Sequence, residues 1–360
     1  MKTLDMILSA TASGGVIMHA KTAGLEASGG GCRAGFAGLV RAMGRLGKYK
    51  IRAFSTYAEK HIEHDCIDYI RLDQYRIHAN EVPDAILAYY DVLPLAGNLS
   101  PLRIGSHHTL LPYIAWDHID INTAPCSWAR DFLKRGYHPH GRWETLPNAV
   151  EGLDGIEWDP VPGRVIYHTS PDRGLHLLLD MWPEIRARVP HATLHVVGDV
   201  RQMIDCKYPP RSVREQRAKM MAAGLAKATA AGGLTMLGRL TRADLLEELR
   251  HAACFAFPCD VVAPCETFSI SVLESMSIGV PVVLQPQDAL ESLWGDAVVI
   301  AGVYQNEFVE AVVEVITDAD AASIVSRRQK KAAEQYTFEN AAKVLDEIIE
   351  GESVEKEKAA

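Results

Sequence analysis

Two glutamates, Glu266 and Glu274, have seven residues between them and a spacing that fits a chemical task. Glu266 falls in a loop, and Glu274 lies in the following helix, roughly 6 Å along its axis at 1.5 Å per residue. The unpaired N–H groups at the start of such a helix, at Phe268, Ser269 and Ile270, attract an anion. A carboxylate one turn deeper can accept two hydroxyl hydrogen bonds from a ribose diol. The pattern predicts a phosphate at the helix tip and a ribose beside Glu274, whereas solvated surface glutamates are the simpler alternative.

The sequence around the glutamates predicts the elements that position them. Two apolar runs, Cys254–Pro258 and Val280–Leu284, have the composition of buried parallel strands. Between them, Thr267 or Ser269 can cap a helix, and Gly279 can end it. The loop and the helix N-terminus should therefore lie at the carboxyl edge of a sheet, where open α/β sheets bind ligands. Burial of both glutamates in ion pairs with neighbouring bases would count against this interpretation.

This block resembles the signature of the retaining glycosyltransferases of family four. The shared residues, in chain order, are Pro258, Glu266, Phe268, Ser269, Leu273, Glu274, Gly279, Pro281, Val282 and Val283. The resemblance implies the GT-B fold, with two Rossmann-like domains facing each other across a cleft and a C-terminal helix crossing back to the first. It also implies that Glu266 contacts hydroxyls of the donor sugar and Glu274 the ribose of the nucleotide. Ser269 departs from the family, which often has Gly at this position.

Strand-like and helix-like segments alternate along the 360 residues, which predicts an α/β protein of two domains. A linker rich in Gly, Pro and acidic residues occupies 151–163. We predict an acceptor-side domain at 1–155 joined by a helix at about 336–350, a nucleotide-sugar-binding domain at 160–335, and a disordered tail at 351–360.

Other candidate residues lie on predicted loops. Arg173 follows a strand, where a cation can stabilise a departing diphosphate, and His168 is the nearest candidate for the second cation that the family places there. The Gly-rich loop before residue 33 is either a turn or a binding loop. The resemblance assigns the donor sugar to His107 or His108, the base to the Gly238–Arg239 turn, and further donor contacts to Gly30, Gly31 and Asn148.

The composition excludes several classes of protein. A net charge of −9 lacks the basic excess of a nucleic-acid binder. The seven scattered cysteines form no CxxC pair and no metal spacing, which favours reduced thiols, a cytoplasmic setting and no metal. No apolar run reaches 18 residues, and the start of the chain is typical of a first strand.

Five cations could contact an anionic membrane weakly or mark a solvated helix end: Arg41, Arg45, Lys48, Lys50 and Arg52.

Together these observations predict an enzyme without cofactor or metal. It would be a retaining hexosyltransferase that moves a hexose-type sugar from a nucleoside-diphosphate sugar, a UDP- or GDP-sugar, to a hydroxyl. The acceptor could be a glycan, a lipid-linked molecule or a small molecule. A non-catalytic nucleotide- or glycan-binding protein and a sugar-nucleotide epimerase, both on the same fold, are the alternatives.

Overall fold

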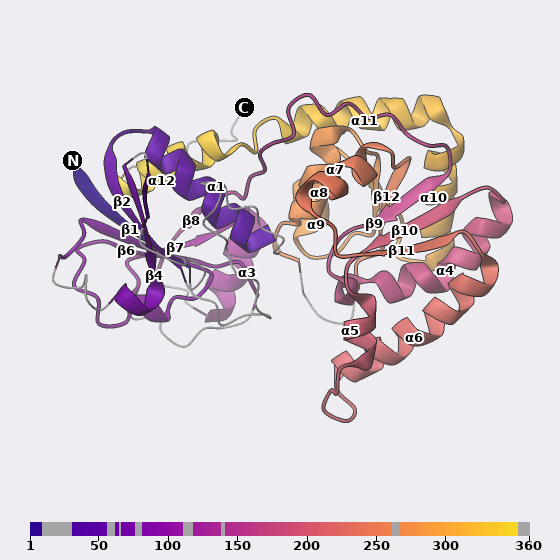
Figure 1. The fold of residues 1–360 in the computed structure, drawn as a ribbon, viewed down its shortest axis with the longest axis horizontal. Coiled ribbons are helices and arrows are strands. Elements are labelled where there is room, and N and C mark those ends of the chain that lie inside the picture. The colour runs from indigo at the N-terminus through magenta and orange to yellow at the C-terminus, as the bar shows by residue number, and fades with distance from the viewer. Residues whose placement is uncertain are drawn as a thin grey trace. The chain divides into compact units, whose positions relative to one another are not determined.

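The computed structural model describes residues 1–8, 31–55, 62–64, 66–75, 81–110, 118–137, 141–260 and 266–351, with only the backbone for 31–33 and 62–64. The chain divides into two compact units, Met1–Glu151 with Gln335–Ala360, and Gly152–Glu334. Each unit contains one sheet flanked by helices (Figure 1). The predicted tail at 351–360 falls outside the described residues except for Gly351.

The first unit has an eight-stranded sheet. Its order is β3 (Ile62–His64), β4 (Ile67–Arg71), β2 (Tyr49–Ser55), β1 (Lys2–Leu8), β5 (Ala85–Tyr89), β6 (Arg103–Ser106), β7 (Ile121–Ala124) and β8 (Arg142–Thr145). All neighbours pair in parallel except β3 with β4. The last strand in chain order, β8, pairs with β7 at one edge of this sheet.

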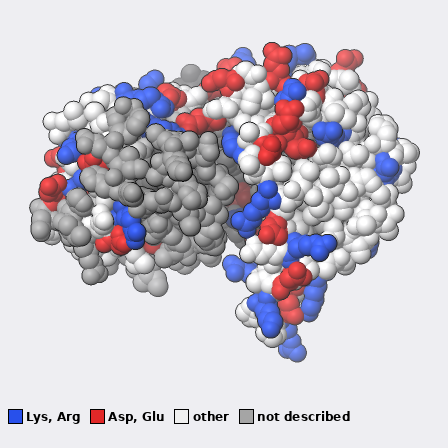
Figure 2. All heavy atoms as spheres, in the orientation of Figure 1, with Lys and Arg blue, Asp and Glu red and all other residues white. Residues whose placement is uncertain are grey.

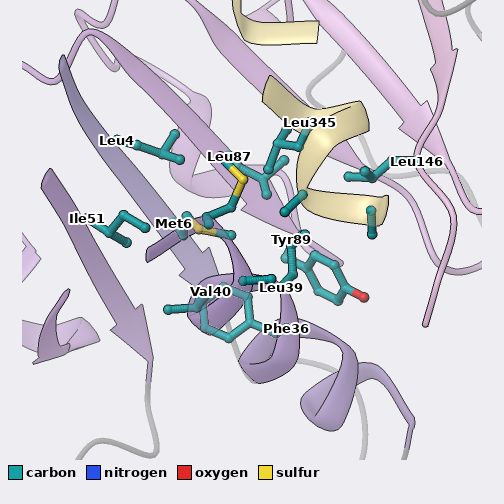
Figure 3. Close-up of a cluster of buried hydrophobic side chains, with 14 of the residues drawn as sticks. Leu4, Met6, Phe36, Leu39, Val40, Ile51, Leu87, Tyr89, Leu146 and Leu345 are labelled. Atoms are coloured by element: carbon teal, nitrogen blue, oxygen red, sulfur yellow. The ribbon is translucent and has the colours of Figure 1, made fainter. Parts of the chain in front are cut away.

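Among the described residues, three α-helices accompany this sheet: α1 (Gly31–Arg45), α3 (Ser127–Tyr137) and α12 (Phe338–Ile349). Side chains of β1, β5, α1 and α12 share one core, to which α12 contributes Leu345 (Figure 3). The two helices approach closely at Gly38, where an added Cβ would lie 2.2 Å from the Phe338 ring. The C-terminal helix is therefore an integral part of the first unit's core.

The cations considered for a membrane contact are largely held in ion pairs within the first unit. Arg41 pairs with Glu151. Three further pairs join Arg45 to Glu339 at 2.6 Å, Lys48 to Asp346 at 2.5 Å and Arg52 to Asp5 at 2.6 Å. These acids neutralise the predicted basic surface. Elsewhere, acidic and basic side chains of the described residues are interspersed on the face that Figure 2 shows.

The second unit has a six-stranded parallel sheet. Its order is β11 (Leu234–Gly238), β10 (Thr193–Val197), β9 (Arg164–Tyr167), β12 (Cys254–Phe257), β13 (Val282–Leu284) and β14 (Val299–Ile300). By position along the chain this is the 3-2-1-4-5-6 order of a Rossmann sheet. The order reverses between β9 and β12, so the loops after these two strands flank the point where such sheets bind ligands.

The helices of the second unit follow the strands in alternation. They are η4 (Pro171–Arg173), α4 (Leu175–Arg188), α5 (Val200–Asp205), α6 (Val213–Ala231), α7 (Arg242–Arg250), α8 (Ile270–Ile278), α9 (Ala289–Trp294), α10 (Gln305–Thr317) and α11 (Ala319–Ala333). All four residues of β12 are buried, as its continuous apolar run requires. The described residues contain no helix that is both long enough and apolar enough to cross a membrane.

Candidate functional site

The helix α8 begins and ends where the sequence indicates. Ser269 is its N-cap, and the Ser269 hydroxyl accepts a hydrogen bond from the N–H of Val272 at 3.4 Å. Gly279 ends the helix with φ 102°. Ser269 has φ 65°, in the region that L side chains avoid and glycine adopts without steric cost. This strain explains physically why Gly is common at this position in the resembled family.

We expect Ser269→Gly to be more stable than Ser269→Ala by about 1–2 kcal/mol. Both variants lose the capping hydroxyl, but only Gly relieves the strain of the positive φ, which Ala retains. Urea unfolding of the wild-type protein and both variants measures the difference. Equal stability of the two variants would show that the backbone at residue 269 is not strained.

The loop that carries Glu266 is anchored by the segment after β13. The Glu266 N–H donates to Asp288 Oδ2 at 3.0 Å. Trp294 donates its indole N–H to the carbonyl of Phe268 at 2.9 Å, and the two rings pack edge to face at 5.2 Å between centroids. The side chain and carbonyl of Phe268, for which the sequence predicted an amide contact with an anion, therefore anchor this loop.

Arg173 and Glu266 lie on opposite sides of the switch point and meet there. Arg173 is in η4 after β9, Glu266 follows β12, and Arg173 Nη1 is 3.6 Å from Glu266 Oε1. Burial raises the pKa of Glu266 to about 7; Arg173 opposes this rise, and Asp288 and Asp172 add to it. The carboxyl group of Glu266 is therefore partly protonated near neutral pH, beside a permanent cation.

The raised pKa of Glu266 predicts that stability falls as pH rises from about 4.5 to above 7. Below the unfolded-state pKa both states are protonated, whereas above the folded-state pKa the protein holds a buried carboxylate. The loss is on the order of 2–3 kcal/mol, since one pKa unit corresponds to about 1.4 kcal/mol. Thermal unfolding of the wild-type protein and Glu266→Gln from pH 5 to pH 8.5 tests this. Glu266→Gln should lose less stability over that range, and identical pH profiles would contradict the prediction.

Glu274 is paired with Arg242, which sequence reasoning missed. Arg242 is the first residue of α7, and its Nη1 donates to Glu274 Oε1. Burial raises the pKa of Glu274, and Arg242 opposes this rise. The only sequence signal for Arg242 is its position, three residues after the Gly238–Arg239 turn.

The predicted base-binding turn lies at the end of β11. Gly238 is the last residue of that strand, has φ 66° and accepts a hydrogen bond from the N–H of Gly198 at 2.7 Å. The exposed Arg239 side chain donates to Gln202 Oε1 at 2.9 Å. The turn leads directly into α7, so Arg242 connects it physically to Glu274.

His168 joins β9 to α8 and does not supply a second cation. Its Nε2 is hydrogen-bonded to the Ser275 hydroxyl at 2.9 Å, and its carbonyl accepts a hydrogen bond from the Ser271 hydroxyl at 3.3 Å. Burial and the nearby Arg242 cation lower the pKa of His168 to about 3. The side chain is therefore neutral at physiological pH, and the interpretation of His168 as the second cation is wrong.

The loop that carries Arg173 is pressed against the end of β12. Gly174 has φ 131°, and a Cβ added there would lie 1.8 Å from the carbonyl oxygen of Pro258. The N–H of Asp260 donates to the carbonyl of Arg173 at 3.1 Å. The buried Asp260 carboxylate is held in turn by Arg217 Nε at 2.5 Å. Asp260 and Arg217 were not predicted, because no local pattern indicates contacts across 43 residues.

In the first unit, the two adjacent histidines have different surroundings. His107 is buried, with its Nε2 2.9 Å from Asn122 Oδ1 and its ring beside Trp143. His108 is half-buried, and its Nε2 lies 3.0 Å from the Ser106 hydroxyl. Burial, and to a lesser extent His107, lower the pKa of His108 to about 3. Both side chains are therefore built into the sheet edge.

Tyr89 brings His108 and Asn148 together. The Tyr89 and His108 rings lie 4.0 Å apart between centroids, and the Tyr89 hydroxyl donates to Asn148 Oδ1 at 3.1 Å. Tyr89 is the last residue of β5. Its contacts with His108 and Asn148 could be inferred only from the strand order. Of the two predicted glycines, Gly30 lies outside the described residues and Gly31 is the first residue of α1.

Residues 161–318 match the family model described as glycosyl transferases group 1. The chain carries a group 1 glycosyltransferase domain. Glu266, Glu274, Arg173, Arg242 and the Gly238–Arg239 turn all lie inside the matched range, so this group 1 domain contains the candidate site of the second unit. The prediction of a glycosyltransferase is confirmed. No curated protein sequence matches the chain significantly.

Solved structures confirm the fold class of the chain. Sucrose-phosphate synthase from Thermosynechococcus elongatus is 14% identical, with 98% of this chain and 99% of that chain covered and a TM-score of 0.72. A glycosyltransferase from Rickettsia africae is 11% identical, with 97% and 98% covered and a TM-score of 0.70. HepE from Anabaena, solved with UDP and glucose, is 14% identical, with 98% and 99% covered and a TM-score of 0.66. At these identities the similarity shows the fold, which is GT-B.

Among the described residues, no cluster of three or more His, Cys, Asp or Glu is arranged to hold a metal ion. The charged residues at the switch point are instead joined in arginine–carboxylate contacts. These arginines are the cations available at the candidate site to meet a phosphorylated ligand.

Proposed function

We propose that the chain is a retaining, metal-independent glycosyltransferase that moves a hexose-type sugar from a nucleoside-diphosphate sugar to an acceptor hydroxyl. The observation that carries this proposal is the 3.6 Å approach of Arg173 and Glu266 across the switch point of a group 1 domain. At this edge of the sheet, a cation can bind the phosphate side of a sugar–phosphate bond, and a partly protonated acid can bind the sugar side. Arg173 would meet the diphosphate, and Glu266 would hold sugar hydroxyls.

The chemistry required of the enzyme is stabilisation of a departing diphosphate. Arg173 would neutralise the charge that develops on the leaving oxygen, aided by the N-terminus of α8 at Ser269 and Ile270. The acceptor hydroxyl would attack the anomeric carbon on the face from which the diphosphate leaves. A phosphate oxygen would take the hydroxyl proton. Because the acceptor attacks on the face from which the diphosphate departs, the anomeric configuration would be retained.

The nucleoside end of the donor fits the other half of the site. Glu274 would accept the ribose hydroxyls, and the Gly238–Arg239 turn would contact the base. UDP was present in the solved structure of HepE, which shares the fold. Among nucleoside-diphosphate sugars, a UDP-sugar is therefore the first donor to examine, followed by a GDP-sugar.

The experiment that tests the function is incubation with UDP-, GDP-, ADP- and dTDP-sugars while release of free nucleoside diphosphate is followed. Turnover of one donor, with the anomeric configuration of the product retained by NMR, supports the proposal. Turnover with inversion would remove retention from it. A protein that neither binds nor turns over any of these donors would contradict it as a whole.

A non-catalytic nucleotide-sugar-binding protein is the second candidate. The neutral His168 favours it, because the site has a neutral group at the position expected for the second phosphate-binding cation. Both glutamates are buried beside arginines, which is the arrangement named above as counting against a ligand site, and structural ion pairs alone would explain it. Tight binding of a donor without turnover would support this candidate over the enzyme.

A further inference from the structure

We infer that Arg242 holds Glu274 as the acceptor of a ribose diol, and that this pair makes the site select ribonucleoside diphosphates over their 2′-deoxy forms. The inference rests on the proposed function, because it assumes that a nucleoside diphosphate occupies the group 1 domain. It adds a positioning residue and a specificity that the proposed function does not contain.

The position of Arg242 is set by the cap of α7. Thr241 is the N-cap, and its hydroxyl accepts a hydrogen bond from the N–H of Asp244 at 3.2 Å. The Arg242 side chain therefore starts from a well-defined helix end, and it reaches Glu274 Oε1. The Glu274 side chain is 11% exposed and that of Arg242 is 36% exposed, so one end of the pair is buried and the other meets solvent.

As an ion pair, Arg242 compensates the buried charge of Glu274, but its position gains no support from helix α7. A cation in the first turn of a helix opposes the helix dipole, so α7 gains nothing from Arg242 at its first position. A buried ion pair also adds little to stability compared with well-packed apolar residues. Arg242 therefore places a cation beside the buried Glu274 directly after the turn proposed to contact the base.

The chemistry of a buried carboxylate explains why a diol acceptor needs this arginine. Arg242 binds one oxygen, and a carboxylate has about four lone-pair positions, so capacity for two hydroxyl groups remains. A protonated carboxyl group would instead donate from one oxygen and lose part of that capacity. Burial favours the protonated form of Glu274, and the Arg242 cation opposes it.

Other charged and titratable groups around α8 do not take over this role. His168, whose Nε2 contacts Ser275 on α8, is neutral. On α11, which packs against α8, Lys330 lies at the other end of the helix, near Gly279. Arg242 on α7 is the charge that contacts Glu274 among the described residues.

The test is calorimetric titration with UDP, GDP and ADP, and with the 2′-deoxy form of the one that binds best, at pH 6 and pH 8.5. The quantity measured is the ratio of the two affinities, in which any effect of Glu266 on phosphate binding cancels. The wild-type protein should prefer the ribonucleotide by about 10-fold or more at both pH values, because a hydrogen bond to a charged group is lost in the deoxy form.

Three variants separate the outcomes. Arg242→Ala should reduce the preference to below about 3-fold at pH 6 and recover part of it at pH 8.5, because the higher pH favours the ionised form of Glu274. Arg242→Lys should keep the wild-type preference, and Glu274→Gln should lose it at both pH values. Arg250→Ala, at the other end of α7 and also paired with a glutamate, is the matched control and should behave as wild type.

The inference is overturned if the wild-type protein binds both nucleotides equally, or if Arg242→Ala keeps the full preference at pH 6. If Arg242→Ala does not fold, the other two variants decide the question. The inference then requires that Arg242→Lys keeps the preference for the ribonucleotide and that Glu274→Gln loses it. Failure of the wild-type protein to bind any of the three diphosphates would instead contradict the proposed function, so the two failures are distinguishable.

Discussion

Arg173→Ala should lower kcat by about 10²- to 10³-fold while weakening donor binding by less than about 10-fold. The reason is that negative charge on the leaving diphosphate increases as the sugar–phosphate bond breaks. A cation beside that bond therefore stabilises the transition state more than the bound donor. Donor affinity by calorimetry and single-turnover rates with the best donor of the panel measure the two effects separately.

Arg188→Ala is the control for the Arg173 variant. Arg188 lies at the end of α4, where it pairs at the surface with Glu310 at 2.7 Å. This variant should keep wild-type kcat, and Arg173→Lys should recover part of the lost rate, because it keeps the charge without the guanidinium plane. Equal losses in affinity and in kcat for Arg173→Ala would show that Arg173 binds the donor without favouring the transition state.

Gly174→Ala should destabilise the protein by about 4 kcal/mol and reduce turnover as well. The Cβ would lie 1.8 Å from the Pro258 carbonyl oxygen, and φ 131° is unfavourable for alanine. Because the atom in the way is backbone, the η4 loop must move away from β12. Arg173 would then lose the hydrogen bond from the Asp260 N–H and its approach to Glu266. Urea unfolding and donor turnover measure the two losses.

Gly232→Ala separates backbone strain from the steric clash. Gly232 follows α6 with φ 77°, but an added Cβ would meet no atom within 4 Å. This variant should cost about 1–3 kcal/mol, less than Gly174→Ala, and leave turnover unchanged. A similar loss of stability in both variants would mean that the contact between Gly174 and Pro258 is unimportant.

Local pattern was sufficient for the elements of the second unit. The predicted end of α8 at Gly279 is confirmed. Continuous apolar runs predicted β12 and β13, and the glutamate block indicated the family that residues 161–318 match. These features depend on neighbours within a few positions, which the sequence displays directly.

The short strands of the first unit were harder to predict. The two strands β3 and β4 were not predicted, and β8 was not recognised after α3. Each has only three to five residues, and strands of that length acquire their stability from pairing with partners elsewhere in the chain.

The sequence alone determined that Arg173 and Glu266 follow strands, that Glu274 lies in the next helix, and what their chemical types are. The tertiary structure decided the partners and the protonation: Arg242 beside Glu274, the neutral His168 on Ser275, and the raised pKa of Glu266. Those properties follow from burial and from contacts between segments that are distant in the chain. Neither burial nor such contacts can be read from local spacing, because they exist only once the parallel strands have assembled.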